Sequence, residues 1–279
     1  MLCICLNFRL IFKALMLHNN QSMDNTIDEI FKIDKLGKGI AVKILFAFLV
    51  VLRLYVNVFP FGSTDFDNFF GYLSDILEDP DLFGNASLSD IPLSKGNIIF
   101  VASILMADFI SICVYYVYVG IMIRFMRKGN EKYQPISAGA LLFRLSILFM
   151  VTFLLFLPGT IILLYLSIFF IIIFPWLFMY PACYLSGDSG FFMSFAEIFR
   201  KNKGYYFVNI RNLAVIMLVS LFLQMISSLV GYIYEPVVIV IDTFIYVFTL
   251  FCVARYSCLI YRRMILLPMR SKGPVDQSN

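Results

Sequence analysis

The chain has 279 residues, of which 61% are hydrophobic and 14% are charged, and its formal net charge is +4. A soluble domain usually carries about 25% charged residues, so this composition excludes an ordinary water-soluble protein and favours membrane spans. The basic residues form no stripe with interleaved aromatics, which excludes nucleic acid as a partner.

Residues 1–38 are predicted to form a cytoplasmic N-terminal segment. Leu2–Leu17 is apolar but contains Arg9 and Lys13, so it is too short and too interrupted to span a bilayer. The charges within the apolar part also depart from the order of a signal peptide. Two interpretations stay open: an interfacial helix, or translation that begins at Met23.

Residues 39–263 are predicted to form the membrane domain, an all-α polytopic helix bundle with six transmembrane helices. No charged residue occurs from Leu145 to Gly187, and one crossing takes about 20 apolar residues, so this stretch crosses twice. Pro158-Gly159-Thr160 predicts a tight turn between the two crossings. The predicted spans are Gly39–Phe59, Asn97–Ile123, Ala140–Leu157, Thr160–Leu185, Leu213–Ile233 and Val237–Tyr261.

The positions of Lys and Arg predict the orientation, because short cytoplasmic loops collect these residues. The opposite side of the six-span arrangement has Lys95 alone, so both termini are expected in the cytoplasm, including the tail 264–279. We expect a multi-pass protein of the bacterial cytoplasmic (inner) membrane. The basic residues assigned to the cytoplasmic side are Arg9, Lys13, Lys32, Lys35, Lys38, Arg124, Arg127, Lys128, Lys132, Arg200, Lys201, Lys203, Arg211, Arg262, Arg263, Arg270 and Lys272.

Residues 61–96 form the predicted acidic outer loop. Its Phe, Leu and Ile residues recur at helical spacing, which predicts an amphipathic helix at the outer interface. This helix is either a solvated acidic face over an apolar anchor or a vestibule that attracts cations. Asn85-Ala86-Ser87 has the form of a glycosylation acceptor. The acidic residues of the loop are Asp65, Asp67, Asp75, Glu78, Asp79, Asp81 and Asp90.

Four polar residues fall inside the predicted spans and are the candidate intramembrane site: Arg53, Asp108, Gln224 and Asp242. A charge near the centre of a membrane helix costs about 2.5–3.5 kcal/mol on insertion scales, so it needs a partner or water. Arg53 is expected to reach either Asp108 or Asp242. The residues are then either a structural ion pair that fixes helix packing or part of a solute or proton pathway.

Two further arginines and two prolines lie in or near the spans. Arg144 and Arg255 are close to the cytoplasmic ends and are expected to snorkel outward. Pro175 and Pro181 are expected to kink the fourth span, because proline removes a backbone donor. The carbonyls that this frees either coordinate a ligand or are satisfied by neighbouring groups.

Residues 186–212 form the predicted cytoplasmic amphipathic connector. Asp188 or Ser189 is expected to cap a short helix that begins near Phe191 and ends at Gly204. Its apolar stripe comprises Phe192, Phe195, Ile198 and Phe199, and its basic residues Arg200, Lys201 and Lys203 are predicted to contact lipid of the inner leaflet.

The order of these elements resembles a group of bacterial polytopic membrane proteins over about residues 141–263. The group includes the membrane domain attached to some glycerophosphodiester phosphodiesterases. The phosphodiesterase catalytic domain is absent here, so the resemblance implies a six-span membrane domain without that activity. The resemblance rests on the order of a proline-bearing span, a short turn, a short helix and a sequence that ends this helix. The residues that carry it are Pro181, Asp188, Gly190, Phe195, Ile198 and Asn202-Lys203-Gly204.

No catalytic motif is found: the chain has no His-Glu-x-x-His, no phosphate loop and no Gly-x-Ser-x-Gly. Its single histidine, His18, excludes a multi-histidine metal site, so we expect no metal, no cofactor and no enzyme activity. The sequence favours a non-catalytic accessory or scaffold protein whose partners are membrane lipids and either a membrane protein or further copies of itself. The alternative is a transporter or channel that uses the intramembrane charges.

Overall fold

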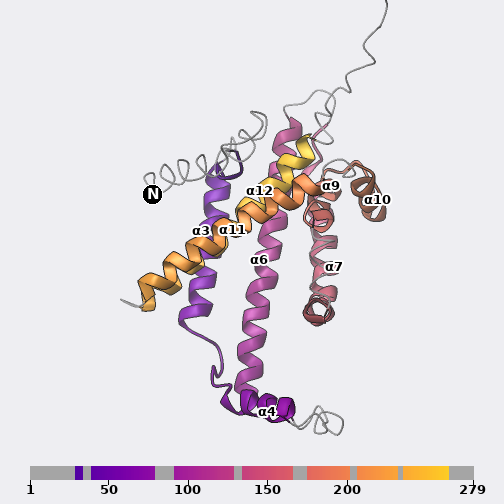
Figure 1. Cartoon of the computed structure of the whole chain (residues 1–279). Coiled ribbons are helices and arrows are strands. Elements are labelled where there is room, and N and C mark those ends of the chain that lie inside the picture. Colours follow the sequence, from indigo (N-terminus) through magenta and orange to yellow (C-terminus); the bar gives the residue numbers. More distant parts are fainter. Residues whose placement is uncertain are drawn as a thin grey trace, which may run out of the picture.

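The computed structural model describes residues 29–33, 39–78, 91–128, 134–165, 175–201, 206–231 and 235–263. Over these ranges the chain forms helices and no strand, which confirms the all-α fold class. The helices are α3 (Gly39–Val58), α4 (Asp67–Glu78), α6 (Lys95–Lys128), α7 (Ala138–Tyr165), α9 (Tyr180–Leu185), α10 (Phe191–Lys201), α11 (Tyr206–Gly231) and α12 (Glu235–Tyr261) (Figure 1).

Five of the described helices are long and apolar enough to cross a membrane: α3, α6, α7, α11 and α12. The chain is therefore a multi-pass α-helical membrane protein. The fourth predicted span, Thr160–Leu185, includes residues 166–174, which lie outside the described ranges. Leu2–Leu17, Met23, Asn85-Ala86-Ser87 and the tail 264–279 also lie outside them.

The tight turn predicted at Pro158-Gly159-Thr160 is wrong. Helix α7 continues through these three residues and ends at Tyr165. Proline fixes φ near the helical value and removes only one backbone donor, and membrane helices tolerate both proline and glycine. A change from one span to the next therefore does not occur at Pro158.

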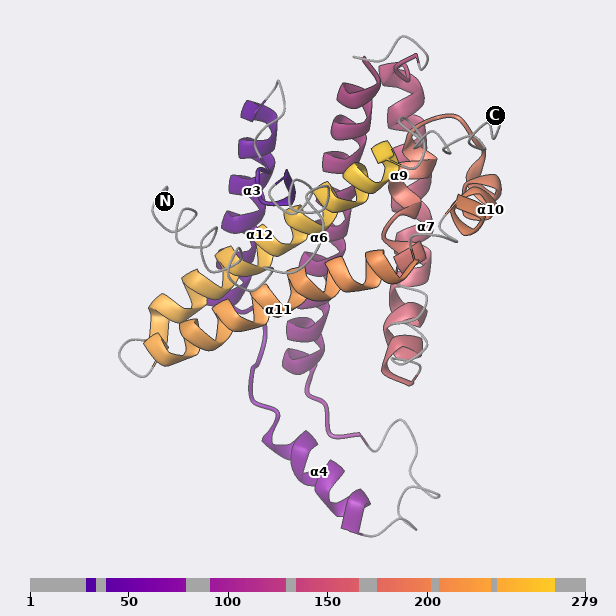
Figure 2. The ribbon, with the colours of Figure 1, turned by 45° about the horizontal axis from the view of Figure 1, so that its top comes forward.

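The membrane helices form a layer of three and a hairpin that crosses it. In both views α3, α6 and α7 run side by side, with α6 between the other two, and the α11–α12 hairpin crosses them obliquely (Figures 1 and 2). Helix α12 is the inner member of this hairpin and packs against both α3 and α6, whereas α11 packs mainly against α12.

The C-terminal half of α12 is the centre of the protein. Every residue from Phe251 to Tyr261 is buried, including Arg255 and Ser257. A helix that is buried on all sides has no polar face, which explains why this span shows so little amphipathic pattern. Tyr118 packs edge-on against Phe251, and Phe178 stacks on Tyr256 with ring centroids 5.5 Å apart.

The outer loop contains the predicted amphipathic helix, α4, which lies at the far end of α6 (Figure 1). The entry to α6 is tied to the end of the α3–α4 connection by Asn97, whose amide donates to the carbonyls of Ser63 (3.1 Å) and Asp65 (2.6 Å). Gly62 has φ +92°, and the Ser63 backbone N–H donates to the Gly96 carbonyl at 3.0 Å. These contacts set the position of the loop relative to α6.

The predicted connector is divided between two helices. Helix α10 begins at Phe191, as predicted, but α11 already begins at Tyr206, so residues 206–212 belong to the following membrane helix. Polar contacts with α12 stabilise this first part of α11. The Tyr256 hydroxyl donates to Asn209 Oδ1 (3.0 Å) and accepts from Asn212 Nδ2 (2.9 Å).

Candidate functional site

Arg53 joins three membrane helices in the half of the bundle nearer α4. It extends from α3, forms an ion pair with Asp108 of α6, and donates from Nη2 to the Tyr246 hydroxyl of α12 at 2.7 Å. Its Nε donates to Ser111 Oγ at 3.1 Å, and its side chain lies over the Tyr246 ring, 4.4 Å from the centroid. We call Arg53, Asp108, Ser111 and Tyr246 the outer cluster. Of the two carboxylates predicted to pair with Arg53, the structure selects Asp108.

The outer cluster satisfies a buried cation. Arg53 is only 8% exposed, and an arginine desolvated in this way requires charge-assisted hydrogen bonds to offset the loss of hydration. Ser111 donates its own proton to the Ala107 carbonyl at 2.7 Å, which leaves its oxygen free to accept from Arg53. The sequence did not indicate Ser111 or Tyr246, because a hydroxyl in an apolar span has no distinctive spacing.

The other two candidate residues line a cavity of about 230 Å³ next to Arg53. Gln224 of α11 and Asp242 of α12 share this cavity with Arg53, Asn57, Thr243 and Tyr246. Asn57 Nδ2 donates to Thr243 Oγ1 at 3.0 Å, whereas Asp242 Oδ1 is buried and has no hydrogen-bond partner. A water molecule needs about 10–15 Å³ by this measure, so the cavity has room for several waters or a small polar solute.

The helix break between the two prolines of the fourth predicted span is hydrogen-bonded to neighbouring helices. Between Pro175 and Pro181 the helix is interrupted at Phe178 and Met179. The Phe178 carbonyl accepts from the hydroxyls of Tyr115 and Ser257, each at 2.8 Å. A carbonyl oxygen has two lone pairs, and both are used here, so neighbouring hydroxyls rather than a ligand satisfy the Phe178 carbonyl.

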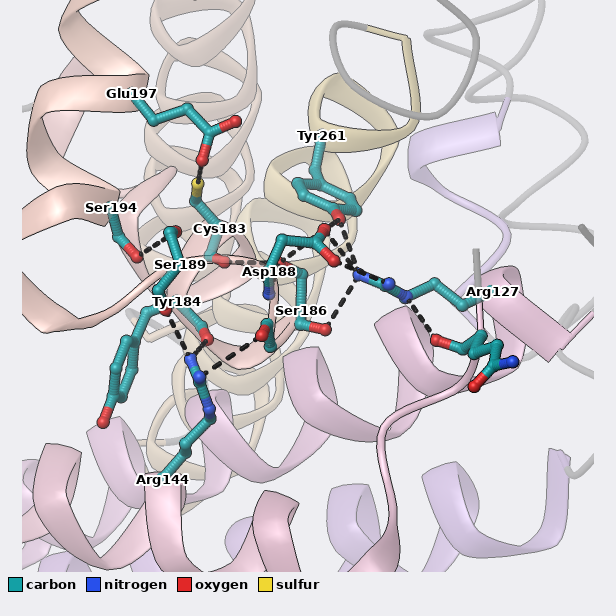
Figure 3. Close-up of polar contacts among 12 residues, drawn as sticks. Arg127, Arg144, Cys183, Tyr184, Ser186, Asp188, Ser189, Ser194, Glu197 and Tyr261 are labelled. Carbon is teal, nitrogen blue, oxygen red and sulfur yellow. Dashed lines mark hydrogen bonds and ion pairs between the residues drawn. The ribbon is translucent and has the colours of Figure 1, made fainter. Parts of the chain in front are cut away.

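A second polar cluster lies at the other end of α6, around residues 186–190, and we call these five residues the 186–190 turn (Figure 3). Arg127 of α6 makes two parallel bonds to Asp188: Nη1 to Oδ2 at 2.6 Å and Nη2 to Oδ1 at 2.8 Å. It also donates to the carbonyls of Ser186 (2.8 Å) and Gln134 (3.0 Å). The Tyr261 hydroxyl, at the end of α12, lies 3.3 Å from Asp188 Oδ2.

This arrangement corrects the role predicted for Asp188. The sequence indicated a helix cap for α10, but the carboxylate is used by Arg127. Partial burial raises the pKa of Asp188, but hydrogen bonds from Arg127 and its positive charge outweigh this effect and hold the pKa below its ordinary value of 3.8. The signal from which the pair could have been predicted is an arginine at the end of one span and an aspartate in the turn after another span, both on the same predicted side of the membrane.

Arg144 of α7 holds the same turn from another side. Its Nη1 donates to the carbonyls of Tyr184 (2.6 Å) and Ser189 (2.8 Å), and its Nη2 donates to the carbonyl of Gly187 (3.3 Å) (Figure 3). Gly187 has φ +90°, which glycine adopts without steric cost. The prediction that Arg144 snorkels outward is therefore wrong, because the carbonyls of the turn satisfy it inside the protein.

The prediction for Arg255 is also wrong. Its side chain is only 5% exposed, and its Nε donates to the backbone carbonyl of Glu29. The described N-terminal residues 29–33 pack here, and Ile30 is itself buried. This segment therefore covers a side chain that the sequence placed at the lipid–water boundary.

The basic residues of the connector differ in their surroundings. Arg200 is exposed, whereas Lys201 bonds to Glu197 one turn earlier at 2.5 Å. Lys203 lies outside the described ranges. The predicted apolar stripe is divided: Ile198 is buried and Phe195 stacks on Tyr180, but Phe192 is exposed.

No group of three or more His, Cys, Asp or Glu side chains that could hold a metal ion occurs in the described ranges. The described cysteines, Cys113, Cys183, Cys252 and Cys258, form no disulfide bond. Comparison of the chain with models of protein families, with curated proteins and with solved structures found no match in any of the three.

Proposed function

We propose that this protein is a non-catalytic accessory or scaffold protein of a bacterial cytoplasmic membrane. The observation that carries the proposal is the use of Arg53: its Nε and Nη2 are bonded to groups of α6 and α12. A charge consumed in this way holds helices in register and is not available to a moving solute. The loose resemblance to membrane domains of glycerophosphodiester phosphodiesterases agrees with a membrane module that has no activity of its own.

The proposal includes six crossings with both termini in the cytoplasm. Five helices in the described ranges are long and apolar enough to cross a membrane, and the sequence of residues 166–174, between α7 and α9, is apolar. The segregation of Lys and Arg supports the orientation. Reporter fusions at each end test it: both ends should respond as cytoplasmic, and reporters that respond in different compartments would contradict an even number of crossings.

The partners in this proposal are membrane lipids and a second membrane protein or another copy of the chain. Helix α11 packs mainly against α12, and its other side carries exposed Leu218, Leu221, Met225 and Leu229. On the connector, exposed Arg200 and Phe192 suit a position on the inner leaflet, and Lys201 and Lys203 follow Arg200 in the sequence.

A flux measurement on purified protein in liposomes tests the scaffold role. We expect liposomes that contain the wild-type protein or Asp108→Asn to be no more permeable to ions and small solutes than empty liposomes. The thermal midpoint should be lower in Asp108→Asn, because Arg53 loses its ionic partner. Flux above that of empty liposomes that is lost in Asp108→Asn would contradict the scaffold role.

A transporter or channel is the second candidate, and Asp242 is the observation that favours it. Its Oδ1 atom has no hydrogen-bond partner and its side chain borders the cavity that Gln224 also lines. In this case the protein conducts a cation or a proton, and Asp242→Asn abolishes the flux without lowering the thermal midpoint. Asp75→Asn, on the exposed helix α4, is the matched control.

A further inference from the structure

A cavity lined by charged and apolar side chains lies at the end of α6 that carries Arg127 and Lys128. Its volume is about 340 Å³, and it lies between residues 29–32, α6 and α12. Lys32, Arg255 and Arg262 line it together with one carboxylate, Glu29. Met122, Phe125, Met126 and Leu259 supply its apolar surface. The cavity therefore has both a cationic and an apolar lining.

Arg255 supplies the observation that points to a ligand. Arg255 is only 5% exposed, and its buried Nη1 atom has no hydrogen-bond partner. Leaving a buried charged donor unsatisfied costs more than leaving a neutral one, and guanidinium has no way to lose its charge. An anionic acceptor in the cavity would satisfy this donor.

The balance of charge favours an anion that several donors can share. The described residues that line the cavity include three cations and one carboxylate, and the Glu29 backbone carbonyl already accepts from Arg255 Nε. Arginine presents paired donors that match the geometry of phosphate oxygens. A phosphate group fits this donor set better than a carboxylate ligand, because it offers more acceptor atoms to Arg255, Arg262 and Lys32.

The apolar lining indicates where the phosphate comes from. Phe125 is 46% exposed and Arg262 is exposed, so the cavity opens at the surface of the protein. Methionine and phenylalanine beside a cationic group suit an acyl chain that continues from a phosphorylated headgroup. A free phosphate would leave that surface uncovered.

We infer that the cavity between residues 29–32, α6 and α12 binds the phosphate group of an anionic phospholipid, with Arg255 as the central donor. This site is separate from the exposed basic residues of α10, because other segments of the chain line it. The lipid connects the N-terminal segment to α12 and so stabilises their contact.

The test measures lipid binding to delipidated, purified full-length protein by native mass spectrometry in detergent. Phosphatidylglycerol, phosphatidylcholine and inorganic phosphate are the three probes. We expect phosphatidylglycerol to be retained in preference to phosphatidylcholine, and Arg262→Gln to weaken its binding about fivefold, the effect of removing one cation near a lipid headgroup. Arg124→Gln, which removes an exposed charge of α6 outside this cavity, should leave binding unchanged.

Arg255→Gln is the stronger variant, but Arg255 is buried, so its folding must be checked by thermal unfolding. Lys32→Gln provides a second cavity variant at the surface segment. Equal binding of the two lipids, or equal loss of binding in Arg262→Gln and Arg124→Gln, would overturn the proposal. If inorganic phosphate competes fully with phosphatidylglycerol, the cavity is a site for free phosphate and the lipid proposal is wrong.

Discussion

Arg127 and Asp188 form a bidentate ion pair that joins the end of α6 to the 186–190 turn, with N–O distances of 2.6 and 2.8 Å. The two residues are far apart in the chain, and the pair acts together with the bond from Arg127 to the Ser186 carbonyl to join the helix end to the turn. Arg127 is 5% exposed, while the Asp188 side chain is 35% exposed. The pair is therefore buried on the arginine side and reached by water on the carboxylate side.

Asp188→Asn should lower the free energy of unfolding by about 1–3 kcal/mol. The substitution leaves the Arg127 guanidinium buried without its counter-charge, and the partial exposure of Asp188 keeps the loss below that of a fully buried pair. Thermal unfolding in detergent measures the effect. Asp75→Asn, on exposed α4, should change the midpoint little, and an equal shift in both variants would show that the pair has no special role.

The stability of the protein should depend on acid pH through Asp188. Its pKa is held below 3.8, so the pair contributes stability above the pKa of the unfolded chain and loses it as the pH falls through the lower folded value. We expect this contribution to be constant from about pH 5 to 7, because about pH 5 is already one unit above an ordinary carboxyl pKa. The contribution should disappear in strong acid. In thermal midpoints measured against pH, the acid decline should be shallower in Asp188→Asn than in wild-type protein.

Gly62→Ala should destabilise the outer loop. Gly62 has φ +92°, and a Cβ atom there would lie 2.2 Å from the Gly96 carbonyl oxygen, so the backbone has to move. We expect a cost of about 1–3 kcal/mol from strain and the displaced contact. The matched control is Gly71→Ala within α4, where a Cβ meets open space and should stabilise the helix by about 0.5–1 kcal/mol. Equal effects of the two substitutions on thermal unfolding would contradict the strain.

Tyr246→Phe should weaken the outer cluster while keeping its shape. The substitution removes the hydroxyl that accepts from Arg53 Nη2 at 2.7 Å but leaves the ring beneath the guanidinium. Loss of one hydrogen bond to a charged group costs about 1.5–3 kcal/mol. Chemical or thermal unfolding measures this loss, and Tyr55→Phe, at an exposed position of α3, is the control. A larger effect in Tyr55→Phe would argue against the assignment of Tyr246.

Some contacts of the candidate site could be expected from the residues alone and others could not. Arg53 and Asp108 are charges in apolar spans at similar depth, and the cost of an unpaired charge predicts that they meet. Asp242 has the same chemistry, yet it borders the cavity instead. The choice between the two carboxylates depends on the oblique crossing of α12 over α3 and α6, which no local pattern specifies.

The apolar length of its segments determined that this chain is a multi-pass helical membrane protein, because the cost of exposed backbone groups in lipid allows few other solutions. The start of α10 could also be predicted, since its turn and its apolar residues act within a few positions along the chain. Only the tertiary structure decided where Arg127, Arg144 and Arg255 place their charges. Their partners come from distant segments, and an arginine side chain is long enough to reach either the lipid surface or a buried carbonyl, so packing makes the choice.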